Sequence, residues 1–288
     1  MWLTREHTAE NEGKFSRRKI VKTVFFCIPI SIFFEIALTV LSEKRRIYFE
    51  KYRNRYSDLS RIDAPFQWKD KSMETFLFMA ILTMLVIAVI SFIVLKKRWQ
   101  FSIKLFLVGL IGFALPVMMI EGPINALVLS SFGHSSKWFT IIYGGLMAGL
   151  VEETTRYLVF KVLAKKRSLM TSDIVAYGFG HGLSEFILLG VMGLLTNIIV
   201  LQAIHSGQAS QLPSLLVSQV NQLTGFAVLM SLFERIVALV LQVLLTAWDF
   251  LAVTKHRLSF YFWAIILHAA IDFLAGAYQL GIVSNLLL

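Results

Sequence analysis

The stretch IIYGGLMAGLVEETTRYLVF, residues 141–160, decides how this sequence folds. It is apolar for most of its length, yet it carries Glu152, Glu153 and Arg156 in its second half. A charged side chain near the middle of a bilayer costs about 2.5–3.5 kcal/mol on insertion scales, so ionisable residues there are rare and usually functional. Arg156 follows the glutamates at i+4 and i+3, which places all three on adjoining faces of one helix. The stretch therefore indicates a membrane helix with an ionic cluster inside it.

The composition of the whole chain is that of a membrane protein. Of its 288 residues, 57% are hydrophobic and 16% are charged, whereas soluble domains have about 45–50% apolar and about 25% charged residues. Apolar stretches of about 20 residues recur along the chain, which favours helices over the alternating strands of an outer-membrane barrel. We therefore predict an all-α, polytopic transmembrane helix bundle that forms a single integral membrane domain over residues 1–288.

Seven spans are predicted, and an eighth short span is left open. Pro116 and Glu121-Gly122-Pro123 interrupt the third span, so we expect a kink or a break there. The apolar residues 281–288 are expected to pack back onto the bundle. The seven spans are 20–41, 74–95, 104–130, 138–163, 173–201, 226–253 and 259–280.

The distribution of Lys and Arg predicts the orientation. They cluster in the tail 1–19 and in the loops after the second, fourth and sixth spans, whereas loops 131–137 and 202–225 hold one Lys and no Arg. The positive-inside rule then places the N-terminus in the cytoplasm and the C-terminus outside. The charged loop 43–72 disagrees, because it would lie outside with nine Lys and Arg. We expect an integral protein of the bacterial cytoplasmic membrane.

The net charge and the cysteine count exclude other classes. The formal charge of +10 belongs to these loops, and no basic patch interleaved with aromatic residues suggests nucleic acid as a partner. The expected partners are the lipid bilayer and a substrate within it. Cys27 is the only cysteine, so neither an internal disulfide nor a cysteine zinc cluster can form.

Four spans carry ionisable residues deep inside their apolar runs. Each of two histidines has an acid four residues later, on its own helix face: His181 with Glu185, and His268 with Asp272. By helix rise, Glu152 lies about 16 Å, His181 about 12 Å and His268 about 13 Å from the cytoplasmic ends of their spans. We therefore expect these three side chains to converge in one polar cavity that opens toward the cytoplasmic half. The remaining pair is Glu234 and Arg235.

A carboxylate and two histidines have two chemical uses, and both stay open. They can hold Zn²⁺ with an open position for water. Alternatively, the carboxylate is a general base on water while the histidines stabilise the developing oxyanion. Structural interpretations compete at single residues: Glu153–Arg156 as an ion pair, Glu234–Arg235 as a clamp, Asp249 as an interfacial residue and Tyr177 as a packing residue.

At these residues the chain resembles the YhfC family of intramembrane metalloproteases, which is similar to the CAAX prenyl endopeptidase and bacteriocin-processing superfamily. Three motifs carry the resemblance, over about 138–280, the expected catalytic helical core: Glu152-Glu153-Thr154-Thr155-Arg156, Tyr177-Gly178-Phe179-Gly180-His181 and His268-Ala269-Ala270-Ile271-Asp272. The elements Gly180-His181-Gly182 with Glu185, and Glu234-Arg235, are closest to the YhfC branch. Gln242 stands where that branch tends to have a further histidine.

The resemblance implies roles for these residues. Glu152 would activate water, with Glu153 as the alternative base, and His181 and His268 would bind metal or stabilise the oxyanion. Asp272 would orient His268. The implied function is hydrolysis of a membrane-embedded or lipid-modified peptide that enters sideways from the inner leaflet. The alternatives are a non-catalytic scaffold or bacteriocin self-immunity protein of this fold, and a secondary transporter, which the lack of an internal repeat makes less attractive.

Overall fold

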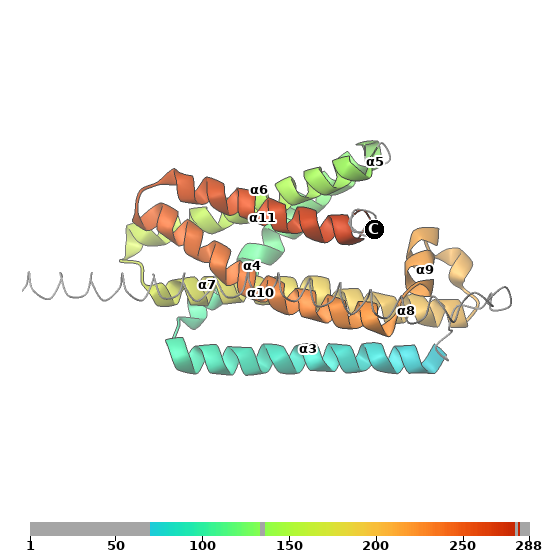
Figure 1. Ribbon diagram of the computed structural model, residues 1–288. Helices are drawn as coiled ribbons and strands as arrows, with labels where there is room; N and C mark the ends of the chain where they lie inside the picture. Colours follow the sequence, from blue (N-terminus) through green and yellow to red (C-terminus); the bar gives the residue numbers. More distant parts are fainter. Residues whose placement is uncertain (1–69, 133–135, 280–281, 283–288) are drawn as a thin grey trace, which may run out of the picture. The chain divides into compact units, whose positions relative to one another are not determined.

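The computed structural model describes residues 70–132, 136–279 and 282, and these residues form helices joined by short connections (Figure 1). They lie in one compact unit, Lys69–Leu288. The expected first span 20–41, the tail 1–19 and the loop 43–72 up to residue 69 lie outside the described residues. The same holds for 133–135, 280–281 and 283–288, so the first span and the possible eighth span stay predictions.

Six of the predicted spans are helices with bounds close to those expected. Five of them are long and apolar enough to cross a membrane: Ser72–Trp99, Ile103–Phe132, Thr171–His205, Gly225–Thr254 and Leu258–Ala277. The sixth, α6, is equally long but less apolar because Glu152, Glu153 and Arg156 lie in it. The elements are α3 (Asp70–Trp99), α4 (Ile103–Pro116), η1 (Val117–Glu121), α5 (Gly122–Phe132), α6 (Lys137–Lys166), α7 (Thr171–Glu185), η2 (Phe186–Val191), α8 (Met192–His205), η3 (Ala209–Gln211), α9 (Ser214–Asn221), α10 (Gly225–Thr254) and α11 (Leu258–Gln279).

Two of the long helices contain a π-helical turn. Pro116 ends α4, and the chain continues through η1 into α5 instead of breaking. The π-turn lies just before Pro123, which lacks the N–H that an α-helix needs and whose ring crowds the turn before it, and a wider turn accommodates both defects. The second π-turn, η2, begins directly after Glu185. π-turns inside α-helices are frequent at functional sites.

Glycines bring together the helices that carry the polar residues. Gly145 and Gly149 of α6 face α11, where an added Cβ would lie 2.7 Å from the carbonyl oxygen of Ala269 or 2.8 Å from that of Ile265. Gly109 of α4 and Gly180 of α7 meet the opposite helix backbone even more closely. Small residues allow such contact between membrane helices. The close approach at these glycines packs α11 against α6 and α7 against α4, and the polar residues of these helices face inward.

Candidate functional site

Glu152 of α6 and His181 of α7 form the centre of the site. The Nε2 atom of His181 lies 2.8 Å from Oε2 of Glu152, and both residues are buried. Phe113 packs edge-on against the His181 ring, and Nδ1 of that ring is buried without a hydrogen-bond partner in the described part of the chain. A carboxylate and an imidazole are thus held together in an apolar surrounding, as the sequence predicts.

His268 of α11 joins this centre from the other side. Its Nε2 lies 3.9 Å from Oε2 of Glu152, and its Nδ1 lies 2.5 Å from Oε1 of Glu153. Asp272, one turn further on, has Oδ2 at 3.5 Å from the same Nε2. The nitrogen of His268 that points away from Glu152 is therefore held by Glu153, a partner that the motif spacing does not indicate.

Arg156 binds the second glutamate. Its Nη1 donates to both carboxylate oxygens of Glu153, at 2.8 Å and 2.6 Å, and the two side chains are fully buried. The ion pair that the sequence suggests is therefore present. The two opposite charges neutralise each other. This pairing matters because an unpaired charge at this depth would be strongly unfavourable.

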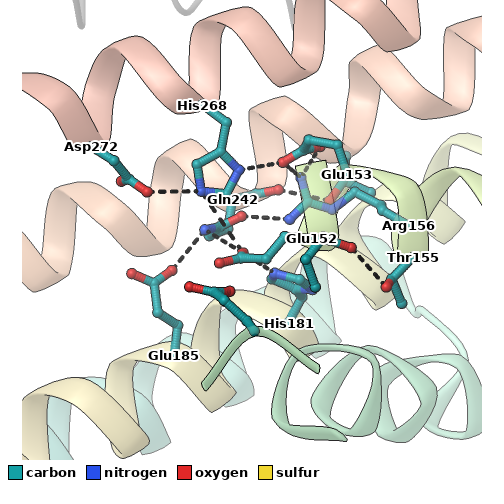
Figure 2. Close-up of polar contacts among 12 residues, drawn as sticks. Glu152, Glu153, Thr155, Arg156, His181, Glu185, Gln242, His268 and Asp272 are labelled. Atoms are coloured by element: carbon teal, nitrogen blue, oxygen red, sulfur yellow. Dashed lines mark hydrogen bonds and ion pairs between the residues drawn. The ribbon is translucent and has the colours of Figure 1, made fainter. Parts of the chain in front are cut away.

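Gln242 of α10 connects this ion pair to the rest of the site. Its Oε1 accepts a hydrogen bond from Nη2 of Arg156 at 2.5 Å. Its Nε2 donates to Glu185 at 2.7 Å and, more weakly, to Glu152 at 3.4 Å. Figure 2 shows the amide between the charged side chains. Sequence reasoning considered Gln242 only as a replaced histidine and missed this bridging position.

The remaining acids lie around Gln242. Glu185, expected beside His181, instead accepts from Gln242 and from Arg235 Nη1 at 3.0 Å. Arg235 also binds Glu234, at 2.7 Å, so the clamp suggested for this pair includes α7 as well. Asp249 of α10 was expected as an interfacial residue; the structure shows that its side chain is fully buried near Glu153 and Arg156. Asp249 lies close to the end of α10, and its side chain faces inward.

One carboxylate and two imidazole nitrogens are the types of ligand atom that bind catalytic metal ions. Two ligand atoms at about 2.1 Å from a tetrahedral ion lie about 3.4 Å apart, and the separations here, 2.8 Å and 3.9 Å, fall on either side of that value. The Nδ1 of His268 has the carboxylate partner that metal-bound histidines usually have, whereas the Nδ1 of His181 has no hydrogen-bond partner among the residues that the structure describes. Among the described residues no three His, Cys, Asp or Glu side chains already have metal-binding geometry.

Fold and site together define a polytopic helical membrane protein with a buried glutamate–histidine centre. The chain belongs to the YhfC intramembrane metalloprotease family, whose model matches residues 82–288. This match confirms the family resemblance drawn from the motifs. The family description implies a metal-dependent peptide hydrolase.

A curated relative supports this membership. The chain is 31% identical over 205 residues to the "Uncharacterized membrane protein YhfC" of Bacillus subtilis (strain 168), and the alignment covers 66% of this chain and 79% of the relative. No solved structure matches the chain.

Proposed function

We propose that this protein is an intramembrane metallopeptidase that hydrolyses a membrane-embedded or lipid-modified peptide. One observation carries the proposal: three separate helices bring Glu152, His181 and His268 to one buried point, with Glu152 Oε2 at 2.8 Å and 3.9 Å from the two ring nitrogens. Burying a cluster of ionisable side chains inside an apolar bundle costs free energy, and such a cluster can polarise water or a carbonyl group. Membership in the family supports the assignment to peptide hydrolysis.

The two adjacent glutamates take different parts in this proposal. Both oxygens of Glu153 are engaged, Oε1 by His268 and Arg156 and Oε2 by Arg156. The contacts of Glu152 within the described residues all go to Oε2. Oε1 of Glu152 is then the oxygen that can accept a proton from water, so Glu152 is the general base and Glu153 positions His268.

The residues that would hold a metal are His181 and His268, through Nε2, and Glu152. Zinc is the proposed ion, because imidazole and carboxylate ligands in a site with an open position are typical of catalytic zinc. When bound, the ion would polarise the scissile carbonyl group and lower the pKa of water. Without a metal, the same two imidazoles would stabilise the oxyanion by hydrogen bonds while Glu152 keeps its role.

The proposed location is the bacterial cytoplasmic membrane, with the N-terminus and the basic loops in the cytoplasm and the C-terminus outside. The distribution of Lys and Arg supports this orientation. The peptide substrate and the lipid bilayer are the partners.

The test combines metal analysis with peptide cleavage. The purified full-length chain in detergent or proteoliposomes is incubated with a panel of single-span and lipidated peptides, and its metal content is measured in parallel. Wild-type cleavage that Glu152→Gln abolishes supports the proposal. The proposal fails if the wild-type chain and Glu152→Gln cleave every peptide to the same extent or not at all, and if cells that carry the variant resist bacteriocin and grow as wild-type cells do. The protein is then a scaffold or an immunity protein.

A further inference from the structure

Side chains of the site that lie toward one end of the helix bundle are buried, whereas acidic side chains toward the other end are partly exposed. Three connections, α3–α4, α6–α7 and α10–α11, lie at the same end of the described bundle (left in Figure 1). We call this the basic end. Its basic residues are Lys96, Lys97, Arg98, Lys104, Lys165, Lys166, Arg167, Lys255 and Arg257.

The side of the site that faces the basic end is closed. Asp249 lies about 8 Å, Tyr177 about 9 Å and Thr246 about 12 Å along their helices from that end. Each of the three has no exposed surface, and neither has Arg156. Phe160 packs against both Tyr177 and Phe250 in the same layer. Among the described residues, these side chains between the basic end and Glu152 on α6, α7 and α10 are therefore buried.

On the opposite side of the site, two acidic side chains are partly exposed. Glu185 and Asp272 lie one helical turn beyond the two histidines, about 21 Å from the basic end, and Glu234 lies about 30 Å from it. The exposed fraction of the side chain rises from 7% at Glu152 to 11% at Glu185, 38% at Glu234 and 39% at Asp272. Figure 2 shows Asp272 and Glu185 on one side of Gln242, and Arg156 on the other.

Exposed carboxylates at this depth require water. A carboxylate that faced hydrocarbon would cost several kcal/mol, so ionisable residues inside membrane spans face a polar cavity or a partner. Oδ2 of Asp272 lies 3.5 Å from Nε2 of His268, and Glu234 forms an ion pair with Arg235. More than a third of each of these two acidic side chains is nevertheless exposed. A wet route along these two residues is the arrangement that avoids that cost.

We propose that water and the polar part of the substrate peptide reach Glu152 from the end of the bundle opposite the basic end, along Glu234, Asp272 and Glu185. Because the positive-inside rule places the basic end in the cytoplasm, the substrate is a peptide segment presented from the outer half of the membrane. This reverses the cytoplasmic opening expected from residue depth alone. The peptide part of the inference rests on the proposed function; the route for water does not.

Cysteine labelling from each side of the membrane tests this route. Cys27 is the only native cysteine, so Cys27→Ser gives a background without thiols. Single cysteines replace Glu234, Asp272 and, as a buried control, Thr246. Exposed Lys255 and Gln208, also replaced singly, mark the basic end and the opposite end. Each variant is treated with a membrane-impermeant thiol reagent in intact cells and in inverted membrane vesicles.

We expect Glu234→Cys and Asp272→Cys to react from the same side as Gln208→Cys, at least about tenfold faster than Thr246→Cys, because thiol reactivity follows access to water. Reaction only from the side that labels Lys255→Cys overturns the inference. So does a lack of reaction at both positions while the two markers react. The two positions are independent, so one misfolded variant, identified by gel filtration, leaves the test intact. Labelling needs no turnover, so a protein without peptidase activity can still confirm the route.

Discussion

Nδ1 of His268 lies 2.5 Å from Oε1 of Glu153, the residue next to the glutamate that Nε2 of the same ring approaches. Adjacent residues of one helix thus contact opposite edges of one imidazole ring. Glu153 also binds Arg156, which leaves it no oxygen for a further task. In the function proposed above, Glu153 is therefore the carboxylate that positions His268, and Glu152 is the carboxylate that reacts.

The first prediction separates the two glutamates. Glu152→Gln keeps size and hydrogen bonding but removes the proton acceptor, so we expect kcat to fall by about 10²–10⁴ with little change in Tm. Glu153→Gln weakens the buried ion pair with Arg156 and the hold on His268, so we expect a lower Tm as well as lower activity. Cleavage assays and thermal unfolding of the two purified variants check this. Normal turnover in Glu152→Gln together with a stable but inactive Glu153→Gln would reverse the assignment.

The second prediction concerns Arg156. Arg156→Ala leaves the Glu153 carboxylate buried without its partner, and breaking such a pair costs about 3–5 kcal/mol. We expect the yield of folded protein to drop more than the specific activity of the fraction that folds. Arg156→Lys keeps the charge but not the fork that spans Glu153 and Gln242, and should lie between wild type and alanine in Tm. Normal yield and Tm with no turnover in Arg156→Ala contradict a structural role.

The third prediction tests the close approach of α4 and α7. Gly180→Ala places a methyl group against the backbone of Phe106, where nothing flexible can yield. We expect α7 and His181 to be displaced and the Tm to fall. Gly144→Ala is the matched control, because its added methyl meets nothing within 4 Å and alanine favours a helix over glycine by about 0.5–1 kcal/mol. Its Tm should stay the same or rise. An unchanged Tm in Gly180→Ala contradicts the tight packing.

Sequence patterns predicted the helices because hydrophobic length and charge placement are local properties. The spans from 74 to 280 were located within a few residues, and the pairing of Arg156 with Glu153 follows from their separation on one helix. The inward rotation of Asp249 and the bridging place of Gln242 depend on how α10 is turned against α6 and α7. Such rotation is set by packing between helices, which a single sequence does not display.

The roles of Glu185 and Asp272 show the same limit. A spacing of four residues placed each acid on the face of a histidine, but side chains on neighbouring helices compete for the same groups. Gln242 and Arg235 engage Glu185, and Glu153 holds the ring nitrogen of His268. The family motif marked Gln242 only as a replaced histidine, and its residue type did not predict the hydrogen bonds to Arg156 and Glu185.

The last prediction concerns the metal. If the site holds zinc, His181→Ala and His268→Ala should each lose the bound ion and the activity together, because either loss leaves a single imidazole. His256→Asn is the control: His256 is an exposed histidine of the α10–α11 connection with φ 53°, and asparagine tolerates that conformation. It should keep both the metal and the activity. Metal content by mass spectrometry and peptide cleavage are measured on the same preparations. Active wild-type protein with less than about one-tenth equivalent of any divalent ion contradicts the zinc assignment, since a catalytic ion is needed in each active molecule. Glu152 would then act with the two imidazoles alone, and chelators should leave cleavage unchanged.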